Sequence, residues 1–520
     1  MKLIPLSILV LQGLAVIQAA KDEVPKGSRE NSTTPLANVR QFLEEARIQN
    51  GIPGMSVAVL YKGKLIFSEG FGKRNDRDPF TPETLTMIGS VTKSFTAAAV
   101  GELVAEGKVD WDTTPVSKYL PEFEVSDPVL TSELTLEDLL SHRSGFPVVD
   151  ASWFYNTESR KELVKRMKYV KVDTKLRPYS KYNNVMTSIA GIAAANAVDM
   201  EYEDLVRQKL IKPLGLNNTG FSIKEMSKHR NYAVPYDVAS FSDAKNGKFI
   251  KLPLNSMATG VAAPAGGLYS NVLDLVRWGQ TIMRYGEQDG KQVLNKDSVI
   301  ETLSAQSIYS KGKRTPEFSP SLTYGMGWIL DSYKGNTVYY HSGKVDGYIS
   351  NLALFPDSEL VVAHLTNIYS NALPEISYLY IADEVLGLPK TMDWAQMAIS
   401  GTQQWYDEAS MALKGFIPER IKNKPPSHDL REFAGDYTDP VYGDLTICIE
   451  KGDKGKEELR LRLRVFEGKL EHYHFDSFKT TLAYSVIHVT QLVTFVTGKD
   501  GKVTGVQVTL ESEVEFQKKK

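Results

Sequence analysis

The sequence predicts an α+β protein of two domains, and three observations lead to this expectation. Segments with the pattern of β-strands lie near both ends of residues 36–400, and helical patterns fill the middle. Beyond residue 428, apolar and polar residues alternate with period two around Gly and Asp turns. The chain has 520 residues, which is long for one hydrophobic core. We therefore expect an antiparallel sheet flanked by helices, with a helical lobe, followed by a small all-β barrel.

Each element of that expectation comes from a short stretch of sequence. A helix is predicted near 38–48, and "GMSVAVLYKGKLIFSEGFG" (54–72) reads as two strands joined at Lys62-Gly63-Lys64. Helical patches fill the middle region. Strands return at 336–343, 347–356 and 360–367, and a helix follows from about Pro374 to Leu386.

The boundaries between segments follow changes in composition. Residues 21–35 are polar with Pro and Gly, and "KGFIPERIKNKPPSHD" (414–429) is charged and carries three prolines. The predicted organisation is a signal peptide at 1–20, a flexible segment at 21–35, an α+β domain at 36–400, a helical and Pro-rich linker at 401–427 and a barrel-like domain at 428–520.

The first residues have the pattern of a secretory signal peptide. A short positive region is followed by an almost wholly apolar run at 3–16, and cleavage is expected after Ala19 or Ala20. An uncleaved anchor is the alternative, but so short a run spans a bilayer poorly, so we expect no membrane span. The protein is expected to be secreted and extracellular, with candidate glycosylation sites at Asn31 and Asn217.

Composition excludes several classes of function. Hydrophobic residues make up 42% and charged residues 24% of the chain, with a formal net charge of −2, so neither a nucleic-acid partner nor a basic membrane surface is expected. There is no glycine-rich phosphate loop, and none of the eight histidines begins His-Glu-x-x-His, so we expect no cofactor and no metal. Cys448 is the one cysteine, so an intrachain disulfide is impossible.

Ser90 and Lys93 are the first candidates for chemistry, in "MIGSVTKSFTAAAVGELVAEGKV" (87–109). Ser-x-x-Lys also occurs at Ser242–Lys245 and Ser310–Lys313, but in polar, turn-rich sequence. Only Ser90 is expected to begin a helix, an amphipathic one, on which residues three apart share a face. A buried lysine loses its charge more easily and could take the serine proton, which creates a nucleophile. A capping serine beside a snorkelling surface lysine is the alternative.

A tyrosine motif supports the catalytic interpretation. Tyr182-Asn183-Asn184 offers a phenol and an amide two residues apart, in a loop mounted on the apolar helix that follows. Tyr-x-Asn also begins at Tyr269 and Tyr369, where we expect structural tyrosines.

A third motif is His341-Ser342-Gly343, at the end of the predicted strand "TVYY". A small residue followed by glycine would let a substrate lie along the strand edge. The amide of Lys344 could complete an oxyanion hole with that of Ser90. A histidine at a strand end is more often structural, so this motif is weak alone.

In order, "SVTK", "YNN" and "HSG" match the three motifs of the serine β-lactamase and penicillin-binding-protein superfamily. The resemblance is closest to its class C, D-aminopeptidase and esterase-like branch, and covers about residues 38–386. It extends to stretches such as "LTLEDLLSHRSGFP" (134–147) and "YGMGWIL" (324–330). The tail "REFAGDYTDPVYGDLTI" resembles the small β-barrel domain that follows the catalytic domain in many members.

The resemblance implies a role for each residue of the first two motifs. Ser90 would be the acylated nucleophile, and Lys93 and Tyr182 would share general-base and general-acid work. Asn184 would position Lys93 and the substrate amide. No cofactor is implied, and the partner is a small-molecule or peptide substrate.

The third motif departs from the family pattern. His341 stands where the resemblance expects the lysine of Lys-Thr-Gly, and a histidine of ordinary pKa, about 6.5, is largely neutral at pH 7. We therefore expect esters, amides, or peptides cleaved from the amino end, with slow penicillin hydrolysis. His142 and Gly145 are expected to shape the fold rather than act.

An alternative from another class stays open. Extracellular relatives of this superfamily occur in animals, including shell-matrix proteins of the gigasin type, so the chain could be an inactive matrix protein that keeps the fold. An α/β-hydrolase is excluded because no Gly-x-Ser-x-Gly occurs. The oligomeric state and the role of the barrel domain are not determined by the sequence.

Overall fold

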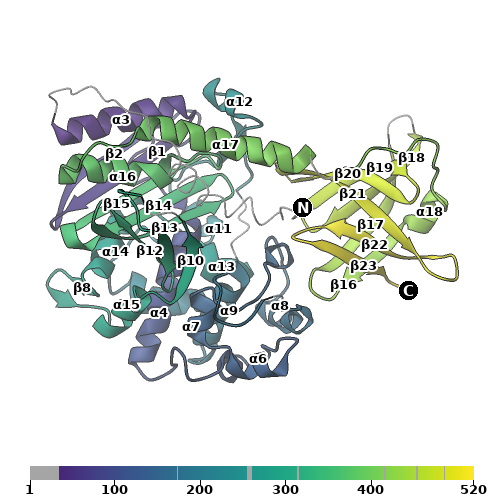
Figure 1. Ribbon diagram of the computed structural model, residues 1–520, viewed down its shortest axis with the longest axis horizontal. Coiled ribbons are helices and arrows are strands. Elements are labelled where there is room, and N and C mark those ends of the chain that lie inside the picture. The colour runs from purple at the N-terminus through teal and green to yellow at the C-terminus, as the bar shows by residue number, and fades with distance from the viewer. Residues whose placement is uncertain are drawn as a thin grey trace. The chain divides into compact units, whose positions relative to one another are not determined.

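The computed structural model (Figure 1) describes residues 34–172, 174–254, 260–312, 315–414, 417–452, 455–484 and 487–520. The predicted signal peptide, nearly all of the segment at 21–35, and Asn31 lie outside these residues. The described chain divides into two compact units. The main unit contains residues 34–148 and 157–405, and the barrel unit contains 149–156 and 406–520.

An eight-stranded antiparallel sheet forms the centre of the main unit, in the order β10-β11-β12-β13-β14-β15-β1-β2. The first strand, β1 (Gly54–Tyr61), pairs with β15 (Leu360–Thr366), so both ends of the domain sequence meet within one sheet. The expected α+β class and antiparallel sheet are confirmed. The other strands are β2 (Lys64–Gly72), β10 (Ser307–Lys311), β11 (Ser321–Tyr324), β12 (Ile329–Tyr333), β13 (Asn336–Val345) and β14 (Tyr348–Phe355).

Helices cover both faces of this sheet, as Figure 1 shows. On one face, Gly279 of α14 (Val272–Met283) lies so close to Leu354 that an added methyl would approach its side chain to 2.8 Å. On the other face, Tyr340 stacks on Tyr378 of α16 (Leu373–Leu386) at 5.6 Å. Every residue of β14 and β15 is buried, and alternate residues of a strand point to opposite faces, so both faces of the sheet are covered at these strands. Helix α3 (Pro35–Gln49) packs on α16.

Helices, most of them short, fill the middle region of the main unit, as expected. They include α5 (Val116–Tyr119), α6 (Pro128–Glu133), α7 (Leu136–Leu140), α8 (Arg160–Lys165), α9 (Asn184–Asn196), α10 (Tyr202–Val206), α11 (Ile223–Met226), α12 (Phe241–Lys245), α13 (Ala263–Gly266) and α15 (Lys296–Thr302).

The helix after Ser90 differs from the prediction of an amphipathic helix. Helix α4 (Thr92–Ala105) is buried almost all round, and every residue from Thr92 to Gly101 is buried. Phe95 stacks on Trp278 at 4.0 Å, and the Trp278 indole N–H donates to the Ser94 hydroxyl. A helix apolar on every side belongs inside a protein, so α4 is the central helix of the unit.

The serines of the other two Ser-x-x-Lys copies lie in regular secondary structure, although turn-rich sequence was expected there. Ser242 and Lys245 lie on helix α12, so Ser90 is not alone in lying at a helix. Ser310 lies in strand β10 rather than in a turn, and Lys313 is outside the described residues. What separates Lys93 from Lys245 is burial, because Lys245 is exposed.

The barrel unit contains a closed barrel of eight strands, as expected. Strand β16 (Gly435–Asp439) pairs with both β17 and β23, which closes the sheet and removes its edges. Phe433 of α18 (Leu430–Phe433) packs on Phe495 at 4.5 Å. The remaining strands are β17 (Gly443–Lys451), β18 (Glu457–Leu463), β19 (Phe466–His474), β20 (Ser477–Tyr484), β21 (Ile487–Thr497), β22 (Val503–Thr509) and β23 (Glu513–Lys518).

One feature of the barrel unit was not predicted. Residues 149–156 belong to it, although they fall within the sequence of the main domain. The Arg464 guanidinium donates to the carbonyl of Ser152 at 3.2 Å, and Tyr155 meets Phe466 edge to face. Helix α17 (Trp394–Lys414) runs through residue 405, where the two units divide, so the first part of the predicted linker is helical.

Candidate active site

Ser90 lies in η1 (Gly89–Val91), a single 3₁₀ turn directly before α4. Gly89 enters that turn with φ of 49°, a conformation that glycine adopts without strain. The preceding carbonyl, that of Ile88, accepts a hydrogen bond from the Ser350 hydroxyl at 2.7 Å. The serine is therefore mounted between the central helix and strand β14.

Lys93 is buried beside Ser90, with 1% of its surface exposed. Its Nζ lies 2.9 Å from Ser90 Oγ, 2.7 Å from Asn184 Oδ1 and 2.8 Å from the carbonyl oxygen of Ala265. The amide and carbonyl oxygens only accept, so they use two N–H groups. At this distance from Ser90 Oγ, a neutral amine can accept the serine proton, as a general base must.

Tyr182 is the tyrosine that the structure brings to this lysine. Lys93 Nζ lies 4.9 Å from the centre of its ring. Asn183 caps the following helix α9, since its side-chain oxygen accepts from the Met186 amide at 3.0 Å. Tyr269 and Tyr369 instead contact His229 and Trp405, each at 6.0 Å between ring centres.

His341 lies inside β13 rather than at its end, and is 3% exposed. Burial, with a smaller contribution from Lys93, lowers the pKa of His341 to about 3. Its Nδ1 lies 2.6 Å from the Ser342 carbonyl, which can only accept, so Nδ1 carries the hydrogen. Nε2 therefore accepts from the Tyr324 hydroxyl at 2.9 Å. His341 is a neutral side chain at physiological pH.

The backbone nitrogens of Ser90 and Lys344 lie where η1 packs closely against β13. A methyl added to Gly343 would lie 2.0 Å from the Ile88 carbonyl oxygen and 2.8 Å from the Ser90 nitrogen. A methyl added to Gly89 would lie 2.7 Å from the Lys344 nitrogen. Only glycine fits at these two positions, and together they bring η1 against β13.

The positive charge of Lys344 is balanced by an ion pair. Its ammonium is paired with Glu375 at 3.4 Å, and the two side chains are 7% and 3% exposed. Neutral His341 and the paired Lys344 thus leave β13 without the standing positive charge that a lysine at position 341 would supply.

A loop between α7 and Tyr182 contributes contacts that the sequence did not predict. His142, which we expected to shape the fold, has its ring 4.3 Å from that of Tyr182 and 4.6 Å from that of Tyr324. Tyr324 and Ala265 were also missed as site residues. Both lie in stretches of the family resemblance, but a carbonyl contact and a ring partner leave no motif of their own.

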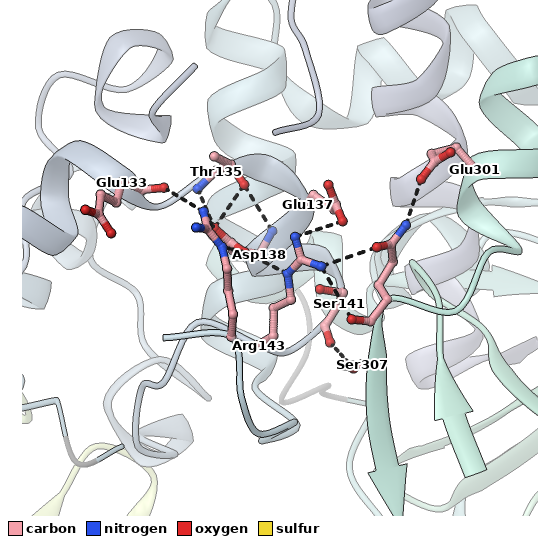
Figure 2. A network of polar contacts seen from close by, with 10 residues as sticks. Glu133, Thr135, Glu137, Asp138, Ser141, Arg143, Glu301 and Ser307 are labelled. Atoms are coloured by element: carbon pink, nitrogen blue, oxygen red, sulfur yellow. Dashed lines mark hydrogen bonds and ion pairs between the residues drawn. The ribbon is translucent and has the colours of Figure 1, made fainter. Parts of the chain in front are cut away.

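An ionic network holds this loop (Figure 2). Asp138 on α7 accepts from Arg143 at 2.7 Å and from Arg177 at 2.8 Å, and Glu137 pairs with Arg143 at 2.8 Å. Burial alone would raise the pKa of Asp138, but the hydrogen bonds from Arg177 and Arg143 hold it below its ordinary value. The carboxylate stays ionised, so the network persists at neutral pH.

Two observations cover the described residues as a whole. None of their helices has both the length and the apolar character needed to cross a membrane. No cluster of three or more histidine, cysteine or acidic residues placed to hold a metal ion occurs among them. Asn217 is exposed, and its glycosylation stays a prediction.

The fold is that of the β-lactamase-like serine hydrolase family. The sequence profile of the beta-lactamase family matches residues 37–385, and this chain belongs to that family. A second profile, that of a domain of unknown function (DUF3471), matches residues 419–520. The predicted superfamily is confirmed.

Known proteins of similar sequence and structure support the assignment. The chain is 27% identical over 454 residues to unguisins hydrolase ungD' of Aspergillus campestris, which covers 81% of this chain and 79% of that protein. It is also 26% identical over 468 residues to putative beta-lactamase-like 1 of Homo sapiens. That alignment spans 87% of this chain and 82% of the human protein. The octameric penicillin-binding protein homologue of Pyrococcus abyssi has a similar fold, with a TM-score of 0.59, 23% identity and 93% of this chain covered.

Proposed function

We propose that this chain is a secreted serine hydrolase that forms an acyl-enzyme on Ser90 and acts on esters, amides or peptides. The observation that carries the proposal is the position of the buried Lys93 amine, 2.9 Å from Ser90 Oγ with two acceptors on its other side. Hydrolase-named relatives support hydrolysis as the reaction class. The proposal of secretion rests on the N-terminal sequence alone.

The mechanism follows from the contacts of the site. Lys93 takes the Ser90 hydroxyl proton as the oxygen attacks the substrate carbonyl, and the amides of Ser90 and Lys344 stabilise the negative oxygen. The proton passes through Lys93 and Tyr182 to the leaving group as its bond to the carbonyl carbon breaks. Water then attacks the carbonyl carbon of the acyl-enzyme and gives up a proton to the Tyr182–Lys93 pair. The proton passes to Ser90 Oγ as its bond to the acyl group breaks, which releases the acid and free Ser90.

Labelling of Ser90 tests this proposal directly. A fluorophosphonate probe is expected to form a stable adduct on the purified wild-type chain, and peptide mapping should place the adduct on Ser90. The Ser90→Ala variant is the control and should remain unlabelled while keeping the wild-type unfolding curve. A wild-type chain that stays unlabelled would favour the alternative, an inactive matrix protein that retains the fold.

The substrates are proposed to lack a carboxylate near the reacting bond. An unpaired buried charge costs about 2 kcal/mol or more, so an activated ester should be hydrolysed about 30-fold faster than its carboxylate-bearing analogue. The measurement is kcat/KM for the matched pair of esters and for nitrocefin. His341→Lys restores a positive charge and should bring the kcat/KM values of the two esters closer together. Equal rates for the two esters in the wild type would contradict the proposal.

A further inference from the structure

His142 is a buried residue with a left-handed backbone conformation and one ring nitrogen without a hydrogen-bond partner in the described part of the chain. Its φ is 61°, in the left-handed region that few non-glycine residues adopt, and its side chain is 0% exposed. Its Nδ1 accepts from the Asn183 amide at 3.2 Å, so the ring hydrogen is on Nε2. Nε2 has no hydrogen-bond partner among the described residues. Backbone strain and unpaired buried polar atoms gather at functional sites.

The residues on either side of His142 are held by different elements, as Figure 2 shows. The Ser141 carbonyl accepts from the hydroxyl of Ser307, on strand β10, at 2.8 Å. Arg143 is paired with Asp138 and also donates to the side chain of Gln306. With both neighbours held, the backbone at His142 cannot relax, so the strained conformation persists.

The contacts of His142 converge on Tyr182. Its carbonyl accepts from the Lys181 amide at 2.7 Å, and its Nδ1 accepts from the Asn183 amide. These are the backbone groups on either side of Tyr182. The imidazole also packs against the phenol ring, with 4.3 Å between ring centres and planes tilted by 45°. One residue therefore contacts the backbone of both neighbours of Tyr182 and one face of its ring.

The protonation state of His142 suits this role. Burial lowers its pKa well below 6.5, and the neighbouring Lys93 and His341 lower it further. The groups that face the ring are the aromatic side chains of Tyr182 and Tyr324. A neutral ring keeps the Nδ1 lone pair that the Asn183 amide requires, across the pH range in which hydrolysis would be measured.

We propose that His142 is a positioning residue, which holds the Tyr182 hydroxyl in place for proton transfer with Lys93 and the substrate. It acts through the hydrogen bond that Nδ1 accepts, and it does not touch the substrate. The inference rests on the proposed function and adds a residue to which the three motifs assign no role.

A double-mutant cycle tests the inference, with ester hydrolysis as the readout. His142→Phe keeps a ring but removes the acceptor, and it should lower kcat about 10²-fold, as misplacement of a catalytic group does, with KM little changed. In a Tyr182→Phe background, the same substitution should change kcat little, because the hydroxyl that it displaces is absent. His142→Asn restores an acceptor and tolerates the left-handed backbone, so it should recover most of the lost rate.

Controls separate positioning from a loss of folded protein. Fluorophosphonate titration counts the active sites in each sample, and Leu163→Ala, a buried substitution on α8, shows how destabilisation alone affects kcat. If His142→Phe does not fold, His142→Ala takes its place in the cycle. The inference would be overturned if His142→Phe lowered kcat equally with Tyr182 and with Tyr182→Phe. It would also be overturned if kcat of His142→Asn were no higher than kcat of His142→Phe. A wild type inert at Ser90 would instead remove the proposed function, and this inference with it.

Discussion

Replacement of Lys93 by methionine is expected to lower kcat/KM for an activated ester by about 10⁴-fold, the upper range for loss of a general base. Methionine fills the same buried space without an amine, so the Ser90 hydroxyl keeps its proton. The other two contacts of the amine, with Asn184 and the Ala265 carbonyl, are also lost. The measurement is the pre-steady-state acylation rate, which isolates attack by Ser90 from later steps.

Lys93→Arg distinguishes a base from a simple source of positive charge. A guanidinium keeps the charge but is never deprotonated in proteins, so this variant should be about as slow as methionine. Both variants are compared with Ser90→Ala, which sets the background rate, and their unfolding curves show whether the chain still folds. An arginine variant with near wild-type acylation would show that Lys93 acts only by its charge.

Gly343→Ala is expected to lower kcat about 10² to 10³-fold, as removal of an oxyanion-hole donor does. The added methyl would lie 2.0 Å from the Ile88 carbonyl oxygen and 2.6 Å from the Ser350 hydroxyl. The backbone oxygen cannot turn aside as a side chain could, so η1 and β13 must move apart. The Ser90 and Lys344 amides would then no longer point at one oxygen.

The control for Gly343→Ala is Gly335→Ala, in the turn before β13. A methyl there meets no atom within 4 Å, although φ of 83° adds some strain. It should retain wild-type kcat with a small loss of stability. Affinity for a tetrahedral phosphonate adduct should fall in Gly343→Ala, whereas ground-state substrate binding should change little. Wild-type kcat in the Gly343→Ala variant would contradict the proposed oxyanion hole.

The fold was largely predictable because its strands carry local patterns. The strands β1, β2, β13, β14 and β15 are each seven residues or longer, and each was expected close to where it lies. Strands β10, β11 and β12 were missed because they are short and half exposed. Their pairing with the longer strands, rather than their own composition, makes them part of the sheet.

The site was predictable where its chemistry follows a spacing in the sequence. Ser90 and Lys93 lie one helical turn apart, and a turn of helix brings such residues together in any fold. Tyr182 and His341 are far apart in the chain, but the order of the three motifs identified both as candidate site residues. No spacing could indicate that the carbonyl of Ala265 faces Lys93, because every residue has a carbonyl.

The sequence by itself determined the family, the longer strands of the central sheet and the candidate nucleophile, since each depends on neighbouring residues or on ordered motifs. The tertiary structure decided what surrounds them. Burial of α4 on every side removes water from Lys93, and burial within β13 makes His341 neutral. The ionic network around Asp138 includes Arg143, the residue after His142, and the His142 ring packs against that of Tyr182. Desolvation and contact between distant segments exist only after the chain has folded, so no local pattern encodes them.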